Sequence, residues 1–114
     1  MGSRERPILD YPLQRYRIMP HLANVFAVSF ALDEMITNFK SARTAVHLNP
    51  ESAESEETHA ILSFLKPLSS TYAQSGITAL REACGGLAFS AYSYFGQLKS
   101  NHDANVTWEG DNNY

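Results

Sequence analysis

The sequence predicts an all-α fold, with two long antiparallel helices followed by an aromatic-rich C-terminal loop. Apolar residues recur at helical spacing in two blocks, residues 18 to 39 and residues 61 to 80. An acidic segment containing a proline separates the blocks, and two adjacent glycines close the second block. The chain has 114 residues, of which 44% are apolar, so one globular domain is expected rather than a disordered segment.

The first block predicts a long helix with most of its circumference buried. Pro20 allows two interpretations: it lies in the first turns if the helix begins near Met19, and it kinks the helix if the helix begins earlier. Residues 1–6 are polar and tag-like or disordered, so the folded region is expected to be residues 7–114. The apolar stripe and its neighbouring face comprise Ile18, Met19, Leu22, Ala23, Val25, Phe26, Phe30, Leu32, Ile36 and Phe39.

The second helix is expected to begin within residues 48–57. Asn49 is a possible N-cap, Pro50 suits the first helical position, and the acids that follow favour the positive end of a helix dipole. Pro67 should bend this helix and Gly76 should weaken it locally. Its apolar positions are Ile61, Leu62, Phe64, Leu65, Leu68, Tyr72, Ile77 and Leu80.

The "CGG" sequence should end the second helix, because Gly85 and Gly86 can supply the left-handed geometry of a C-cap. The remaining residues, from Leu87 onward, are predicted to form a loop with at most one turn of helix. Two long helices cannot enclose their own apolar faces. The chain is therefore predicted to be part of a larger helical bundle, completed by self-association or by the rest of a longer protein.

Composition argues against several kinds of function. The net charge is −3 and no long basic run occurs, so nucleic-acid binding is not expected. No apolar run approaches the roughly 20 residues that span a bilayer, and no targeting signal is visible. Cys84 is the only cysteine, and the four histidines are remote from it and lack metal-ligand spacing. We therefore expect neither a catalytic cysteine nor a metal site.

Two short motifs are candidate sites, each with a simpler alternative. Glu109 in "TWEGDNN" could act as a base if Trp108 excludes water from the carboxylate, or it could be a surface acid, which the pattern alone favours. Gly85 and Gly86 could let backbone N–H groups approach a phosphate, or they could simply cap the helix, which is the more common role.

The order and separation of the motifs are more specific than each motif alone. The segments "ILDYPLQRYRIMPHLANVFA", "HAILSFLKPLSSTYAQSGITALREACGG" and "TWEGDNN" together resemble the C-terminal helical region of the acyl-CoA oxidases. The resemblance runs from Pro7 to the end of the chain, and a little over twenty residues separate "REACGG" from "EGDNN". "SFLKPLSS" and "ITALREACGG" lean toward the pristanoyl-CoA-oxidase-like branch. The fold expected is therefore a bundle of the acyl-CoA oxidase and dehydrogenase type.

The resemblance implies part of an FAD-dependent peroxisomal enzyme of fatty-acid β-oxidation, which converts acyl-CoA to trans-2-enoyl-CoA and passes electrons to oxygen, giving hydrogen peroxide. It assigns Glu109 as the catalytic base. Gly85 and Gly86 would lie near the flavin across a homodimer interface, and Asp111 and Asn112 would lie beside the cofactor. The complete enzyme would bind FAD, acyl-CoA and oxygen.

The sequence also departs from the family pattern. The family usually has "CGGHGY", whereas this chain has "CGGLAF", with Leu87, Ala88 and Phe89 in place of two polar residues and a glycine. The domains that hold most of the flavin are not part of this sequence, so the chain resembles a fragment or a truncated relative that is inactive and without FAD by itself. The alternative function is a non-catalytic helical module for dimerisation or regulation.

Overall fold

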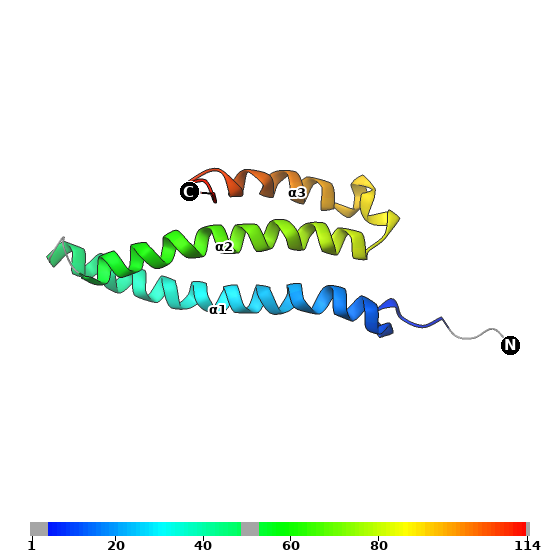
Figure 1. Cartoon of the computed structure of the whole chain (residues 1–114), viewed down its shortest axis with the longest axis horizontal. Coiled ribbons are helices and arrows are strands. Elements are labelled where there is room, and N and C mark those ends of the chain that lie inside the picture. Colours follow the sequence, from blue (N-terminus) through cyan, green and yellow to red (C-terminus); the bar gives the residue numbers. More distant parts are fainter. Residues whose placement is uncertain (1–4, 49–52, 114) are drawn as a thin grey trace.

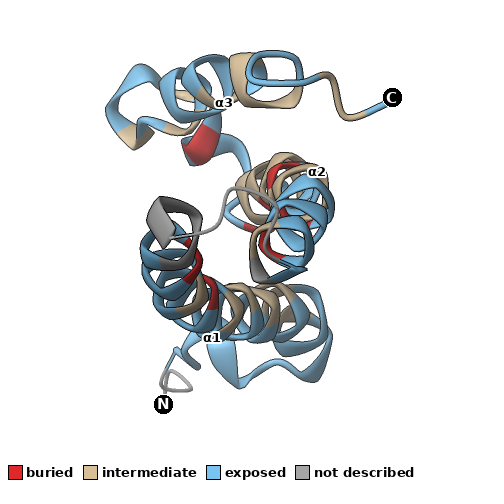
Figure 2. Cartoon of the chain, turned by 90° about the vertical axis from the view of Figure 1, so that its left-hand side faces the viewer, coloured by how far each residue is buried: buried red, intermediate tan, exposed pale blue. Residues whose placement is uncertain are grey.

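The computed structural model describes residues 5–48 and 53–113, and within these residues every regular element is helical. A short 3₁₀ helix, η1 (Ile8–Asp10), leads into α1 (Pro12–Leu48), and α2 (Ala53–Ala83) follows. The chain then forms η2 (Gly86–Phe89), η3 (Ala91–Ser93), α3 (Phe95–Asp103) and η4 (Ala104–Val106). Helices α1 and α2 run antiparallel, and α3 lies on the other side of α2 (Figures 1 and 2). The all-α prediction is confirmed.

Helix α1 begins earlier than Met19, so Pro20 lies inside it. Pro12 occupies the first helical position, where a missing N–H costs nothing. The ring nitrogen of Pro20 cannot donate to the carbonyl of Tyr16 one turn earlier. The helix nevertheless continues to Leu48, which makes it 37 residues long and the longest element of the described chain.

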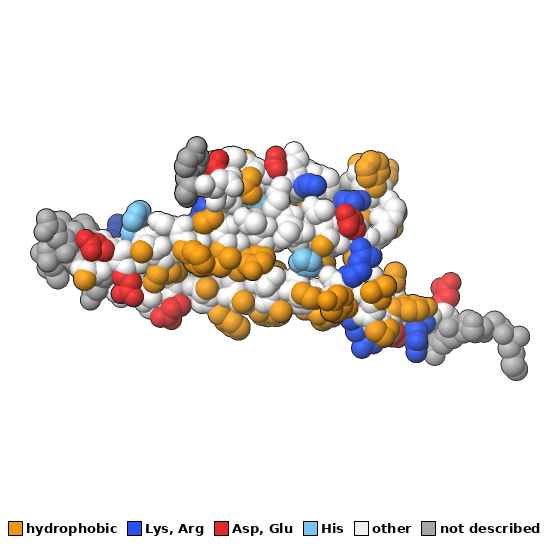
Figure 3. All heavy atoms as spheres, in the orientation of Figure 1, with side chains coloured by type: hydrophobic (Ala, Val, Ile, Leu, Met, Phe, Trp, Pro, Cys, Tyr) orange, Lys and Arg blue, Asp and Glu red, His pale blue; other side chains and the backbone are white. Residues whose placement is uncertain are grey.

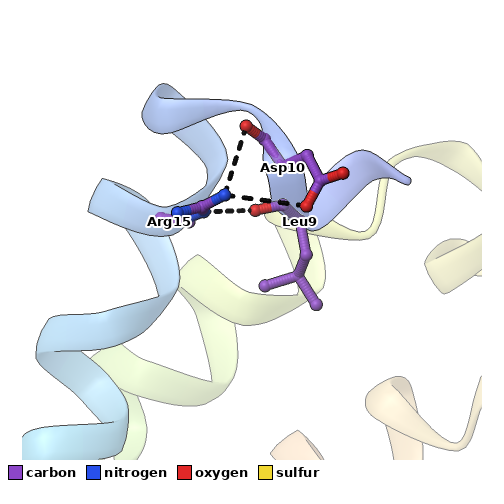
Figure 4. A network of polar contacts seen from close by, with 3 residues as sticks. All are labelled: Leu9, Asp10 and Arg15. Carbon is purple, nitrogen blue, oxygen red and sulfur yellow. Dashed lines mark hydrogen bonds and ion pairs between the residues drawn. The ribbon is translucent and has the colours of Figure 1, made fainter. Parts of the chain in front are cut away.

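Arg15 fixes the entry into α1 (Figure 4). Its Nε donates to the carbonyl of Leu9 at 2.6 Å, and its Nη2 lies 3.6 Å from a carboxylate oxygen of Asp10. Because both side chains are about half exposed, the ion pair itself contributes at most about 1 kcal/mol. The contact mainly fixes the angle between η1 and the start of α1.

Helix α2 ends as the glycine pair predicts, although only one glycine provides the special geometry. Gly85 has φ +70° and ψ −157°, a region that glycine alone occupies readily. Gly86 is different: it begins η2 and is not among the described glycines with positive φ, so the left-handed prediction for it is wrong. Gln14 of α1 donates to the carbonyl of Ala83 at 2.7 Å, which satisfies one of the free acceptors of the last turn. The expected start at Asn49 and Pro50 lies outside the described residues.

The buried core is a thin seam between α1 and α2. Met35 and Ala42 from α1 are buried there, as is Leu65 from α2. Most of the large apolar side chains of α1 face outward, including Val25 at 64% and Phe30 at 70% exposure. The expectation that α1 is buried round most of its circumference is therefore wrong for this chain, because only α2 is present to cover it. Figure 2 shows buried positions on α1 and α2 where the two helices face each other, and a further buried segment beside α3.

The C-terminal region is more helical than predicted. Instead of a loop with one helical turn, residues 95–103 form α3, which is 9 residues long, with 3₁₀ turns before and after it. Polar contacts hold this region to α2: Gln74 donates to Asp103 at 2.9 Å, and His102 Nε2 lies 3.0 Å from the carbonyl of Ser70. A search for apolar periodicity misses such a helix because its attachment is mainly polar.

A shallow apolar groove of about 550 Å³ runs between α1 and α2. In the space-filling view apolar side chains follow this groove (Figure 3). The His21 side chain of α1 packs beside Gly76 in this groove, since a Cβ built on Gly76 would lie 3.4 Å from Nδ1 of His21, at the near limit of ordinary van der Waals contact. Helix α2 continues through Gly76 without a break, so the predicted local weakening stays a prediction, and His21 of α1 lies against the glycine.

Substitutions at Gly76 test this close contact. Gly76→Ala should change the free energy of unfolding by less than about 1 kcal/mol, because the gain in helix propensity offsets a tight contact. Gly76→Leu should destabilise by about 1 to 3 kcal/mol, because the side chain must push α1 away. Urea unfolding followed by circular dichroism measures both, with Ser75→Leu as the control at the neighbouring exposed position. Equal costs for Gly76→Leu and Ser75→Leu would contradict the close approach.

Candidate functional site

The "TWEGDNN" motif forms a tight turn after η4. The N–H of Trp108 donates to the carbonyl of Ala104 at 3.0 Å, and the N–H of Asn112 donates back to the carbonyl of Val106 at 3.1 Å. Between them the backbone takes two positive φ angles, +52° at Glu109 and +102° at Gly110. A positive φ is uncommon for glutamate, so the surrounding contacts must hold the turn in place.

Asn112 attaches this turn to α2. Its Nδ2 donates to the hydroxyls of Ser70 at 2.8 Å and Thr71 at 3.1 Å, and its Oδ1 accepts a hydrogen bond from Lys66 at 2.8 Å. Both kinds of hydrogen-bonding atom in the amide are thus satisfied within the chain. Asn112 therefore links the end of the chain to three side chains of one helix.

His102 makes a second connection beside the first. Its Nδ1 lies 2.9 Å from Nδ2 of Asn105, and its Nε2 lies 3.0 Å from the carbonyl of Ser70. The two bonds together define the tautomer: Nδ1 accepts from the amide and the Nε2–H donates to the carbonyl. Ser70 is buried and is contacted by both His102 and Asn112. The end of α3 and the motif turn are therefore held at the same place on α2.

Lys66 provides the positive charge where the motif turn contacts α2. Its ammonium donates to the carbonyl of Gly110 and to the side-chain oxygen of Asn112. The side chain is half-buried. The lysine therefore binds the motif turn at two points, one on the backbone and one on a side chain.

Glu109 lies at the outer side of the turn and faces solvent. Trp108 is 57% exposed, so in this chain the indole does not exclude water from the neighbouring carboxylate. The exclusion of water considered from the sequence would require other groups to cover the indole. The N–H of Glu109 has no hydrogen-bond acceptor within residues 5–48 and 53–113. The carboxylate and the free N–H of Glu109 thus belong to one exposed turn, where the first can accept a proton and the second can donate a hydrogen bond.

Asp111 stabilises the turn from within. One of its carboxylate oxygens accepts the N–H of Asn113 and the side-chain amide of Asn113, each at 2.8 Å. These two hydrogen bonds, with a smaller contribution from the charge of Lys66, lower the pKa of Asp111 below its ordinary value. Asp111 is therefore a carboxylate that helps to order the end of the motif.

Gly85 and Gly86 lie far from the motif turn. Asn112 contacts residues 66 to 71, whereas Gly85 follows the end of α2 at Ala83. A separation of 13 residues between Ser70 and Ala83 corresponds to about 20 Å along a helix. A Cβ built on either glycine would meet nothing within 4 Å, so this loop is open to a further group. Within one copy of the chain, the two sets of candidate residues form two separate regions.

No three His, Cys, Asp or Glu side chains gather as metal ligands within residues 5–48 and 53–113. Cys84 is exposed at the end of α2. In the part of the chain that the structure describes, no helix has the combination of length and apolar character needed to cross a membrane.

Comparison with known proteins identifies the family. The family model "Acyl-CoA oxidase, C-alpha1 domain" matches residues 1–114, and the chain belongs to this family. Human peroxisomal acyl-coenzyme A oxidase 3 is 37% identical over 97% of the chain, and the peroxisomal acyl-coenzyme A oxidase 2 of Arabidopsis thaliana is 32% identical over 95%. The chain spans only 16% and 15% of these two relatives, about a sixth of their length.

A solved structure agrees with the assignment. The crystal structure of acyl-CoA oxidase 3 from Yarrowia lipolytica superimposes with a TM-score of 0.81 at 28% identity, covering 98% of this chain and 18% of that one. The arrangement of the helices is thus that of an acyl-CoA oxidase, as the motifs predicted. The expected helical bundle and the family are both confirmed.

The sequence did not reveal the residues that hold the motif turn. Lys66, Ser70, His102 and Asn105 are separated from the motif by up to 46 positions, and no periodicity connects them. The one available signal was a lysine between apolar residues in "SFLKPLSS", a segment quoted for its resemblance but given no role. Only the folded helix shows that its ammonium reaches the end of the chain.

The hydrogen bonds of Asp111 predict a pH dependence of the motif turn. Because the folded-state pKa is lowered, the stabilisation is fully present above the ordinary aspartate pKa and is lost as the pH falls through the lowered value. We therefore expect the turn to loosen only below about pH 4. The fluorescence anisotropy of Trp108, the single tryptophan, reports this change. Asp111→Asn should abolish the transition, and an unchanged transition in that variant would assign it to another group.

Proposed function

We propose that this chain is the part of an FAD-dependent acyl-CoA oxidase that carries the catalytic base, and that the base is Glu109. The proposed reaction converts an acyl-CoA to a trans-2-enoyl-CoA, with oxygen as electron acceptor and hydrogen peroxide as second product. The observation that carries the proposal is the exposed carboxylate of Glu109. This residue has a positive φ, and hydrogen bonds from its turn to α2 hold the turn in that strained conformation. Family membership over the whole chain supports the substrate class.

The chemistry assigned to this chain is proton removal and charge stabilisation. The Glu109 carboxylate takes the proton from the carbon next to the thioester carbonyl. The free N–H of the same residue donates to the thioester oxygen, which gains negative charge as the proton leaves. Bound FAD in the complete enzyme would supply the acceptor for the hydride of the neighbouring carbon and the route of the electrons to oxygen. For efficient reaction, other parts of the complete enzyme must cover Trp108 and exclude water.

The candidate cofactor residues fit this role to different degrees. Gly85 and Gly86 lie on an exposed loop with open space around their Cα atoms, which suits close approach of a bound group. Asp111 and Asn112 are proposed on the family resemblance. The amide of Asn112 is already engaged with α2, so a contact from it to a cofactor would have to use its backbone. Because the two regions are about 20 Å apart along α2, we propose that they serve different copies of the flavin in a homodimer.

A substitution in an oxidase that contains this chain tests the role of Glu109. Glu109→Gln should lower kcat by at least about 100-fold, because the amide cannot accept the proton, while flavin remains bound. Peroxide release measures turnover, and the visible flavin spectrum measures occupancy. Glu57→Gln, which removes an exposed carboxylate at the start of α2, is the matched control. Near-normal turnover of Glu109→Gln would exclude it as the base.

The isolated chain provides a second test. It should purify without stoichiometric FAD and should release no acyl-CoA-dependent peroxide, since it spans about a sixth of the relatives' length. Absorbance in the visible range and a peroxide assay measure the two properties. Peroxide production that disappears with Glu109→Gln would show instead that these residues suffice for the reaction.

A non-catalytic module for dimerisation or regulation is the second candidate function. The exposed apolar residues of α1 favour it, as does the "CGGLAF" sequence, in which Leu87 and Phe89 are 80% and 85% exposed. A flavin spectrum of the complete protein discriminates the two, because only the oxidase binds FAD. Two relatives are named as peroxisomal, and we propose the same location for this protein.

A further inference from the structure

Lys66 has an unusual set of partners for a half-buried lysine. Its ammonium donates to two uncharged oxygens, the carbonyl of Gly110 and the side-chain oxygen of Asn112. Within residues 5–48 and 53–113 it takes part in no ion pair. Hydrogen bonds from a charged donor are stronger than those between neutral groups. Both acceptors flank the turn that presents Glu109.

We propose that Lys66 is a positioning residue for Glu109, and this inference rests on the proposed function. The ammonium binds the residue directly after Glu109 and a second residue two positions further on. Two attachment points on one short turn fix its orientation as well as its position. Lys66 thus sets the direction of the Glu109 carboxylate without touching the substrate.

The backbone of the turn explains why a clamp is needed, by which we mean the two hydrogen bonds from Lys66 to Gly110 and Asn112. Glu109 has φ +52° and Gly110 has φ +102°, and a positive φ is energetically unfavourable for a residue other than glycine. Without an outside contact, the Glu109 backbone would relax toward negative φ and rotate the carboxylate away. The charge of Lys66 also favours the ionised form of Asp111, which orders the same turn through Asn113. The lysine therefore supports the turn in two ways.

The contacts of Asn112 alone do not provide this restraint. Its bonds to Ser70 and Thr71 hold the turn three residues beyond Glu109, and the intervening glycine can rotate. The bond from Lys66 to the carbonyl of Gly110 acts on the Gly110–Asp111 peptide, one residue from Glu109 and closer to it than the docked side chain of Asn112. Loss of the lysine should therefore free Glu109 while leaving Asn112 docked on α2.

The first test measures the turn in the chain itself. Lys66→Met keeps a long side chain with high helix propensity but removes the donor. It should lower the fluorescence anisotropy of Trp108 and raise its quenching by acrylamide. Lys99→Met, which removes an exposed lysine from α3, should change neither. Equal circular dichroism spectra confirm that folded chains are compared.

A second variant, Asn112→Ala, controls for the case in which Lys66→Met disturbs the folding of α2 itself. Asn112→Ala alters the turn without altering that helix, and it should also lower the Trp108 anisotropy. Adding Lys66→Met to Asn112→Ala should lower the anisotropy less than Lys66→Met does alone, because one shared contact is already lost. If Lys66→Met reduces helix content, this comparison with Asn112→Ala still decides whether the lysine holds the turn. Full additivity of the two changes would overturn the clamp.

The third test measures catalysis in an oxidase that contains this chain. Lys66→Met should lower kcat by about 10- to 100-fold, since a displacement of about 1 Å costs that much. The KM for acyl-CoA and the flavin content should change by less than about twofold, because Lys66 contacts neither ligand in the proposal. A lysine with a purely structural role would instead lower the amount of folded, flavin-containing enzyme and leave kcat per flavin unchanged.

The outcomes separate this inference from the proposed function. If the wild-type oxidase is active and Lys66→Met leaves kcat per flavin unchanged, the positioning role is wrong and the proposed function stands. If the wild-type protein has no oxidase activity, the proposed function fails, while the Trp108 measurements still decide whether Lys66 holds the turn. A Lys66→Met chain that behaves like Lys99→Met in anisotropy and quenching rejects the clamp altogether.

Discussion

The arrangement of the chain depends on α2 having two faces of opposite chemistry. One face packs against α1 through Leu65 and the close approach at Gly76. The other presents an ammonium, hydroxyls and an amide to α3 and the motif turn, from Lys66, Ser70, Thr71 and Gln74. Because successive residues of a helix are about 100° apart, a shift of one position would misplace both faces together. The middle helix therefore sets where every other element lies.

The polar contacts of α2 are made largely within the chain, whereas the apolar surface of the long helices is only partly covered. On the polar face, both the hydroxyl and the carbonyl of Ser70 have partners in the chain, whereas Oε1 of Gln74 is buried without a partner among the described residues. On the apolar side, α1 leaves large side chains such as Phe26 and Phe30 more than half exposed. A helix with such a surface is stable in water only with further neighbours. The site is thus assembled on the part of the domain that is complete, and the incomplete part faces where the rest of a bundle would pack.

Sequence reasoning predicted those features that depend on local chemistry. Apolar periodicity predicted α1 and α2, and glycine chemistry predicted the end of α2 at Gly85. It did not predict α3, whose attachment to α2 uses Asp103 and His102 rather than an apolar stripe. The motif that includes Glu109 was recognised by resemblance, whereas the lysine that holds it was not, because 44 positions separate Lys66 from Gly110. Contacts between distant polar residues leave no periodic signal in a single sequence.

The backbone conformation of Glu109 has a consequence for how this protein would respond to selection. Glycine or asparagine would adopt φ +52° at lower cost, so glutamate is a poor choice for the turn on grounds of stability alone. A library selected only for thermal resistance would be expected to replace it, whereas one selected for turnover would keep it. Under the proposed function, position 109 is therefore one at which the demands of folding and of chemistry oppose each other, and the glutamate found there records that chemistry prevailed.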